Sequence, residues 1–127
     1  MFYHVMVGTT DTEKAIEFYD TVLGALGYDP GVVDSKGRAF YLNKYGTFGV
    51  GLPIDGAPAS HANGGTIGFR AETTEAVDAF HAAGIANGGE AIEEPPGLRK
   101  GISANLYIAY LRDPDGNKIC AVHRQVS

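Results

Sequence analysis

Two side chains could carry metal or thiol chemistry: Cys120, the only cysteine of the chain, and His4. A thiolate and a neutral imidazole both bind zinc or iron. Catalytic zinc sites generally take three ligands from the protein, so these two donors make only part of a site. Because free cysteines are commonly buried as small apolar residues, the sequence favours packing for Cys120 and leaves a metal contact as the alternative.

Other side chains could contact a ligand without reacting with it. Tyr41 and Tyr110 stand in similar segments, and tyrosine combines an apolar ring with a polar tip. Arg70 and Arg112 could form ion pairs at the rim of a site or bind the carboxylate of a substrate. These four residues are therefore candidates for ligand contacts.

The two halves of the chain repeat each other. "HVMVGTTDTEKAIEFY" aligns with "TIGFRAETTEAVDAFH" at a constant offset, so that His4 lies over Thr66. Later, "FYLNKYGTFGVGL" is similar to "AYLRDPDGNKICAV" at a slightly larger offset. We therefore predict one domain made of two modules, residues 1–56 and 64–127, with a linker at about 53–65. The second copy is longer, and its extra residues fall in the Pro/Gly/Ser-rich segment 93–105, which is predicted to be a loop.

Each module is predicted to contain a strand, a helix and three further strands. The first helix should begin at Thr10, with Glu13 completing a capping box, and should end at Gly24 and Gly27. Alternating residues and turn signals place the later strands at about 31–33, 38–43, 47–52, 91–93, 106–112 and 118–122. This pattern predicts an α+β protein built from two βαβββ modules.

Strand alternation predicts which residues share a face. Val5 and Val7 should pack on the first helix, which leaves His4 and Met6 on the other side. With "DPDGN" as a five-residue hairpin turn, Tyr110 faces Cys120, and the corresponding pair in the first module is expected to be Tyr41 with Val50. The strand faces without a covering helix would together line a cup.

Composition restricts the possible partners. The chain of 127 residues is 44% hydrophobic and carries 10 Lys and Arg against 15 Asp and Glu, for a formal net charge of −5. No basic stripe is present, so neither nucleic acid nor a membrane is an expected partner. A single cysteine forms no intramolecular disulfide, and no apolar run is long enough to span a bilayer. The sequence predicts a cytoplasmic protein.

Three segments resemble the vicinal oxygen chelate superfamily, which includes glyoxalase, bleomycin-resistance and extradiol-dioxygenase proteins. These segments are "FYHVMVGTTDTEKAIEFYDTVLGALGY", "GFRAETTEAVDAFHAAG" and "YLRDPDGNKICAVH". The resemblance implies that the two modules form a curved mixed sheet, the cup, with the helices on its outer face. It also implies a homodimer, although it leaves open whether the cup forms within one chain or between chains.

The resemblance also implies where a metal would be held. Metal-dependent members place a His on the first strand and a Glu on the last strand of each module. Here the four positions correspond to His4, Val50 or a neighbour, Thr66 and Cys120, so only His4 keeps the ligand of the family. We therefore expect no cofactor, with a divalent metal bound through His4 as the alternative.

Three functions compete at this stage. The first is a small-molecule binding protein of the glyoxalase/bleomycin-resistance type with a degenerate metal site. Its ligand would be flat or hydrophobic, and the acidic chain mildly favours a cationic one. The second is a glyoxalase-like lyase or isomerase, or a dioxygenase-like enzyme, that uses an altered divalent-metal site; the third is an accessory subunit. The residues expected to line the cup are His4, Met6, Tyr41, Thr66, Tyr110 and Cys120.

Overall fold

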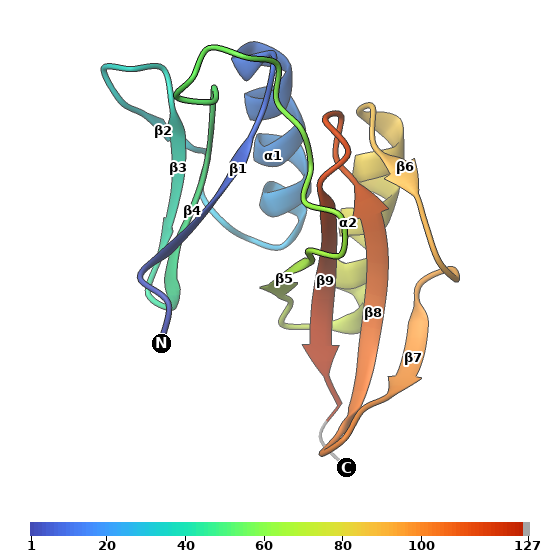
Figure 1. The fold of residues 1–127 in the computed structure, drawn as a ribbon. Helices are drawn as coiled ribbons and strands as arrows, with labels where there is room; N and C mark the ends of the chain where they lie inside the picture. Colours follow the sequence, from blue (N-terminus) through green and yellow to red (C-terminus); the bar gives the residue numbers. More distant parts are fainter. Residues whose placement is uncertain (126–127) are drawn as a thin grey trace.

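The computed structural model describes residues 1–125, which form two mixed sheets, each with one helix. Figure 1 shows the sheets side by side, with the segment after β4 running from the first sheet to the start of the second. The α+β class and the two βαβββ modules are confirmed, because each sheet is built from one half of the chain. Within the described residues, neither helix is long and apolar enough to cross a membrane.

The strand order is the same in both modules. The first sheet has the order β1-β4-β3-β2, from β1 (His4–Gly8), β2 (Val32–Val33), β3 (Ala39–Asn43) and β4 (Gly46–Gly51). The second has the order β5-β9-β8-β6, from β5 (Ile67–Arg70), β6 (Glu90–Ala91), β8 (Asn105–Arg112) and β9 (Lys118–Arg124). In each module the first strand pairs in parallel with the last, while the hairpin strands pair antiparallel.

A fifth strand of the second sheet, β7 (Gly97–Lys100), lies in the segment that was expected to be a loop. It pairs with the first half of β8, whereas β6 pairs with the last two residues of β8. Because β8 is 8 residues long, β6 leaves most of its edge without a partner. The strand β7 supplies hydrogen-bond partners for the backbone groups along that edge. The composition of the segment, rich in Pro, Gly and Ser, did not indicate this strand.

Both helices begin at side-chain caps. Helix α1 (Thr12–Ala25) is capped by Asp11, whose carboxylate accepts the backbone N–H of Lys14 at 3.2 Å. The expectation that Thr10 caps this helix is wrong, because its hydroxyl instead accepts the N–H of Ala59 in the linker. The helix ends near Gly27 as expected, where φ of +90° favours glycine.

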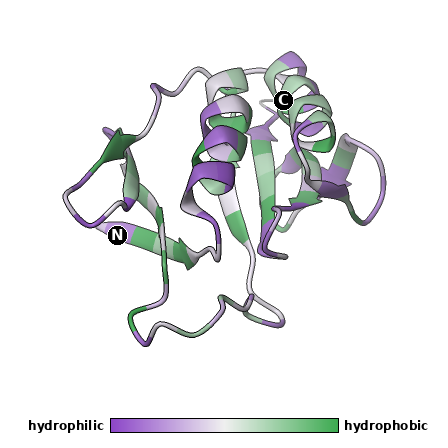
Figure 2. Cartoon of the chain, turned by 90° about the horizontal axis from the view of Figure 1, so that it is seen from above, coloured by the Kyte–Doolittle hydropathy of each residue, from purple (hydrophilic) through white to green (hydrophobic). Residues whose placement is uncertain are grey.

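Helix α2 (Thr74–Ala86) is capped by Thr73, and it packs against α1. Hydrophobic residues lie along strands of both sheets, and hydrophilic residues lie on the helices as well as in turns (Figure 2). The largest fully buried side chains are contributed by both helices and both sheets: Phe18, Tyr19, Leu23, Val50, Phe80, Leu111 and Ile119. The helix pair therefore joins the two modules into one core.

The hairpin turn between β8 and β9, residues 113–117, also joins the modules. The buried Asp113 carboxylate accepts the Tyr19 hydroxyl at 2.6 Å and the Asn117 side-chain amide at 2.9 Å. That amide also donates to the carbonyl of Gly8 at the end of β1, and Asp115 accepts the N–H of Thr10. Burial, followed by the nearby Asp113 carboxylate, raises the pKa of Tyr19 well above its usual value, so this hydroxyl keeps its proton.

We expect Asp113→Ala to lower the free energy of unfolding by about 2–4 kcal/mol, because it leaves a buried hydroxyl and a buried amide without their acceptor. The matched control is Asp115→Ala, which removes a bond at the half-buried rim of the same turn and should cost about 1 kcal/mol. Denaturant titration measures both values. Equal losses for the two variants would contradict this account of the turn.

Candidate functional site

A cavity of about 370 Å³ lies between the two modules, at the end of β1 that carries His4. The first sheet contributes residues of β1, β3, β4 and the β3–β4 turn, and the second sheet contributes all of β5. Small-molecule sites typically measure about 300–1,000 Å³ and lie between packed units, so this cavity has the size and place of a ligand site.

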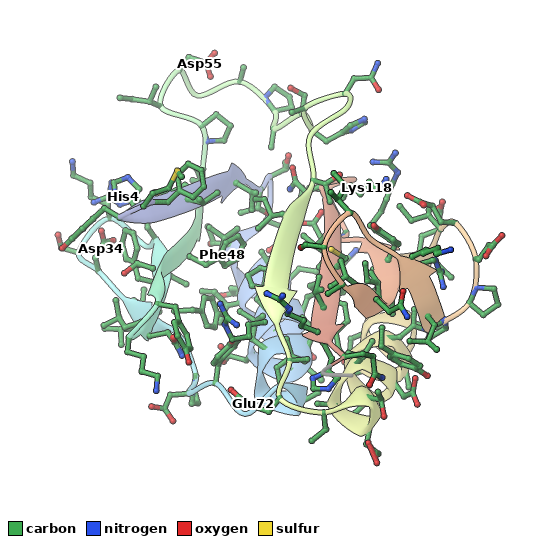
Figure 3. The ribbon with its side chains drawn as sticks, turned by 90° about the horizontal axis from the view of Figure 1, so that it is seen from below. His4, Asp34, Phe48, Asp55, Glu72 and Lys118 are labelled. Atoms are coloured by element: carbon green, nitrogen blue, oxygen red, sulfur yellow. The ribbon has the colours of Figure 1, made fainter. Side chains whose placement is uncertain are left out.

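Aromatic rings form much of the cavity wall. Phe48 of β4 and Phe69 of β5 meet edge to face with ring centroids 5.0 Å apart. This pair connects the two sheets, and Figure 3 shows Phe48 in the interior of the molecule. The other aromatic residues of the wall come from the N-terminal segment, β3 and two turns: Phe2, Tyr3, Tyr28, Tyr41 and Tyr45.

The polar groups of the cavity lie at its rim. The guanidinium carbon of Arg70 lies 4.5 Å from the centroid of the Tyr45 ring, in a cation–π contact. The Tyr28 hydroxyl donates to the Arg70 carbonyl at 2.8 Å, which ties the segment after α1 to the end of β5. Burial raises the pKa of Tyr28, and the positive charge of Arg70 partly opposes that rise. Arg70 therefore acts electrostatically on a hydroxyl that also lines the cavity.

Only some of the residues expected to line the cup are among those that line the cavity. His4 and Tyr41 line the cavity, whereas Met6 lies farther along β1 on the face away from α1, against Gly49. Thr66 is exposed just before β5. Their expected contact with a ligand stays a prediction.

Tyr110 and Cys120 form a cross-strand pair as expected, on the face of the second sheet turned away from α2. Neither is among the residues that line the cavity. Lys118 lies 4.8 Å above the Tyr110 ring and forms an ion pair with Glu93. This face of the second sheet adjoins the cavity wall at Gly68, which pairs with Cys120.

The expected pairing of Tyr41 with Val50 is wrong. Tyr41 pairs with Phe48, and Val50 pairs with Ala39. The Tyr41 hydroxyl donates to the Asp20 carboxylate of α1 at 2.8 Å, so Tyr41 lies on the face of the first sheet that is turned toward the helix. Tyr110, in contrast, lies on the face of the second sheet that is turned away from its helix. A shift of one residue reverses the face of every side chain in a strand. The sequence alignment of the two modules matched the Tyr-Leu pair at Tyr41 with the one at Tyr110, and this match is one residue out of the structural register.

The same register narrows the position in the first module that corresponds to Cys120, which was expected at Val50 or a neighbour. Cys120 pairs with Gly68 of β5, and the equivalent pair in the first sheet is Met6 with Gly49. Gly49, which has no side chain, therefore occupies the position, and Val50 is 1% exposed in the core.

Cys120, one of the positions at which the resemblance implies a metal ligand, is a buried free cysteine. Burial raises the pKa of Cys120 to about 11, which keeps the thiol protonated near neutral pH. Among residues 1–125, no group of three or more His, Cys, Asp and Glu side chains could hold a metal ion. Figure 3 shows His4 on the first sheet and Lys118 on the second.

Sequence reasoning missed most of the aromatic residues of the cavity wall, among them Tyr28, Tyr45 and Phe48. Tyr28 follows α1, Tyr45 lies in the β3–β4 turn and Phe48 points toward β5. Aromatic residues in turns were the available signal, but only the packing of the two modules brings them together. Arg70 was identified, and within the described residues neither it nor Arg112 takes part in an ion pair.

Comparison with known proteins places these observations in a family. The model of the Glyoxalase/Bleomycin resistance protein/Dioxygenase superfamily matches residues 2–121. A crystal structure of a glyoxalase/bleomycin resistance protein from Albidiferax ferrireducens is 60% identical, with a TM-score of 0.94, and the match covers 98% of this chain and 99% of that one. No curated protein matches the chain.

More distant structures share the fold. A putative glyoxalase from Bacillus halodurans is 22% identical with a TM-score of 0.74, over 97% of this chain and 95% of that one. A glyoxalase/bleomycin resistance protein/dioxygenase family enzyme from Burkholderia phytofirmans is 20% identical with a TM-score of 0.70, over 97% and 98% of the two chains.

We expect Cys120 to react slowly with iodoacetamide at pH 8 in the folded protein, and its rate to rise steeply toward pH 11. A pKa of about 11 leaves about a hundredfold less thiolate at pH 8 than an ordinary cysteine has. Mass spectrometry of the modified protein measures the rate. The same protein in denaturant is the control, and equal rates in the folded and unfolded chains would contradict the burial of this thiol.

Proposed function

Because the chain belongs to the Glyoxalase/Bleomycin resistance protein/Dioxygenase superfamily, we propose that it is a small-molecule binding protein whose metal site is degenerate. The ligand occupies the cavity between the modules. The aromatic wall of this cavity is the observation that carries the proposal, because it offers apolar stacking surfaces with a few polar groups at the rim.

The donor set supports binding without a metal. The four positions at which metal-dependent members place ligands hold His4, Gly49, Thr66 and Cys120 in this chain. Glycine has no side-chain donor, and Cys120 is a buried thiol with a raised pKa. The remaining imidazole makes too few ligands for a tightly held divalent ion.

The alternative is an enzyme of the glyoxalase or dioxygenase type with an altered metal site. One observation favours it: His4, at a ligand position of the family, also lines the cavity. A metal held through His4 would then need donors other than those at the remaining three positions.

Two further properties belong to the proposal. A homodimer is supported by apolar side chains that stay exposed on the first module outside the cavity wall, including Val32 at 58% and Leu52 at 60%. A cytoplasmic location is supported by Cys120, which is a buried free thiol that a reducing compartment preserves.

Binding in the cavity predicts a specific effect of Tyr45→Ala. Removing this wall residue should weaken the binding of a two-ring aromatic probe by about tenfold, because one stacking surface is lost. Isothermal titration calorimetry measures the affinity. Tyr107→Ala is the matched control, since Tyr107 lies on β8 and is not part of the wall. Equal affinities of the two variants would place the ligand elsewhere.

Metal analysis separates the two functions. After incubation with manganese, iron(II), cobalt, nickel or zinc and removal of free ions, we expect far less than one metal ion per chain, in the parent protein and in His4→Ala alike. Elemental mass spectrometry measures the content. About one ion per chain, lost in His4→Ala but kept in His61→Ala, would establish the metal site and favour the enzyme.

A further inference from the structure

We infer that the cavity selects planar organic anions, with an aromatic carboxylate stacked on the aromatic wall and paired with the guanidinium of Arg70. This inference rests on the proposed function, because it names the ligand class of the same cavity. It reverses the expectation that an acidic chain favours a cationic ligand. The reversal follows from the charges that line the cavity.

The wall of the cavity carries no negative side chain. The chain has 15 Asp and Glu residues, yet none of them is among the residues that line this space. The wall includes the positive charge of Arg70 and the imidazole of His4. Two acidic residues act on wall hydroxyls without being part of the wall: Glu72 affects Tyr28, and Asp20 accepts the hydroxyl of Tyr41.

Local charge outweighs net charge for a ligand inside the cavity. Exposed charges separated by more than a Debye length, about 8 Å at physiological salt, are largely screened. A cation at the rim would meet Arg70 directly and would be repelled. An anion at the same place gains a charge-assisted hydrogen bond.

Arg70 is held in place without being neutralised. Within residues 1–125 the ion pairs are Arg38 with Asp34 and Lys118 with Glu93, so Arg70 has no carboxylate partner there. Its contact is with the face of the Tyr45 ring, which is no acceptor for a conventional hydrogen bond. A guanidinium with free N–H groups matches the two oxygens of a carboxylate.

The aromatic wall explains why the anion should be planar. Phe48 and Phe69 present a T-shaped pair inside the cavity, and Tyr45 stands at the rim beneath Arg70. A flat ring system can stack against these side chains while its carboxylate reaches the guanidinium. The site therefore combines one stacking region with one anion contact.

Three probes of the same ring system test the inference on the full chain: 1-naphthoate, 1-naphthalenemethanol and 1-naphthylmethylammonium. Calorimetry in low salt should give the tightest binding for the carboxylate and the weakest for the ammonium. Arg70→Met should weaken naphthoate binding by about tenfold or more and leave the alcohol nearly unchanged, because only the anion loses its charged partner.

Lys44→Met is the matched control. The Lys44 ammonium also lies over the Tyr45 ring, at 5.1 Å, but Lys44 does not line the cavity. The variant therefore removes the same unit of charge from the same neighbourhood and should leave the affinity for naphthoate nearly unchanged. Arg70→Lys should recover only part of the affinity, because an ammonium cannot pair with both carboxylate oxygens in the fork geometry of arginine.

The outcomes separate this inference from the function on which it rests. Equal affinity for the carboxylate and the alcohol, or an equal loss in Arg70→Met and Lys44→Met, would overturn the anion preference while leaving an aromatic binding site. Binding of none of the three probes would overturn both the inference and the proposed cavity function.

Discussion

The buried carboxylate of Asp113 is the constraint on which the arrangement of the two modules depends. It belongs to the turn between β8 and β9, yet it accepts the hydroxyl of Tyr19 on α1, 94 residues earlier in the chain. Through Asn117 the same turn bonds to the carbonyl that ends β1. A buried carboxylate needs such donors because its desolvation is costly, so the hydrogen bonds of the turn also determine where α1 lies relative to the second sheet.

This connection leaves the other end of β1 available for a cavity. At the Gly8 end the modules are joined by the turn, and at the His4 end they meet through Tyr28, Arg70 and Tyr45. Between the latter contacts the Phe48–Phe69 pair joins the sheets without filling the space. The cavity is thus formed by both modules, and its wall combines side chains that neither module would present alone.

The arrangement of the two modules determines which side chains line the cavity and which lie outside it. Cys120 lies on the face of the second sheet turned away from α2 and is not among the residues that line the cavity, and its raised pKa keeps it a thiol. Gly49 and Thr66 add no strong donor, whereas Arg70 stands at the rim without an acidic partner among residues 1–125. The residues that line the cavity are therefore suited to stacking and to charge recognition.

The sequence by itself determined the features that depend on local periodicity. The repeat, both helices, the principal strands, the "DPDGN" turn and the pairing of Tyr110 with Cys120 were all predicted, because alternating residues and turn residues act over a few positions. Only the tertiary structure decided the face of Tyr41, the position of Gly49, the strand β7 and the wall around Arg70. Register changes a side chain's face with a shift of one residue, and the contacts that join the modules link residues far apart in the chain. Such contacts leave no periodic signal in the sequence, which is why the cavity emerged only from the packing of the two modules.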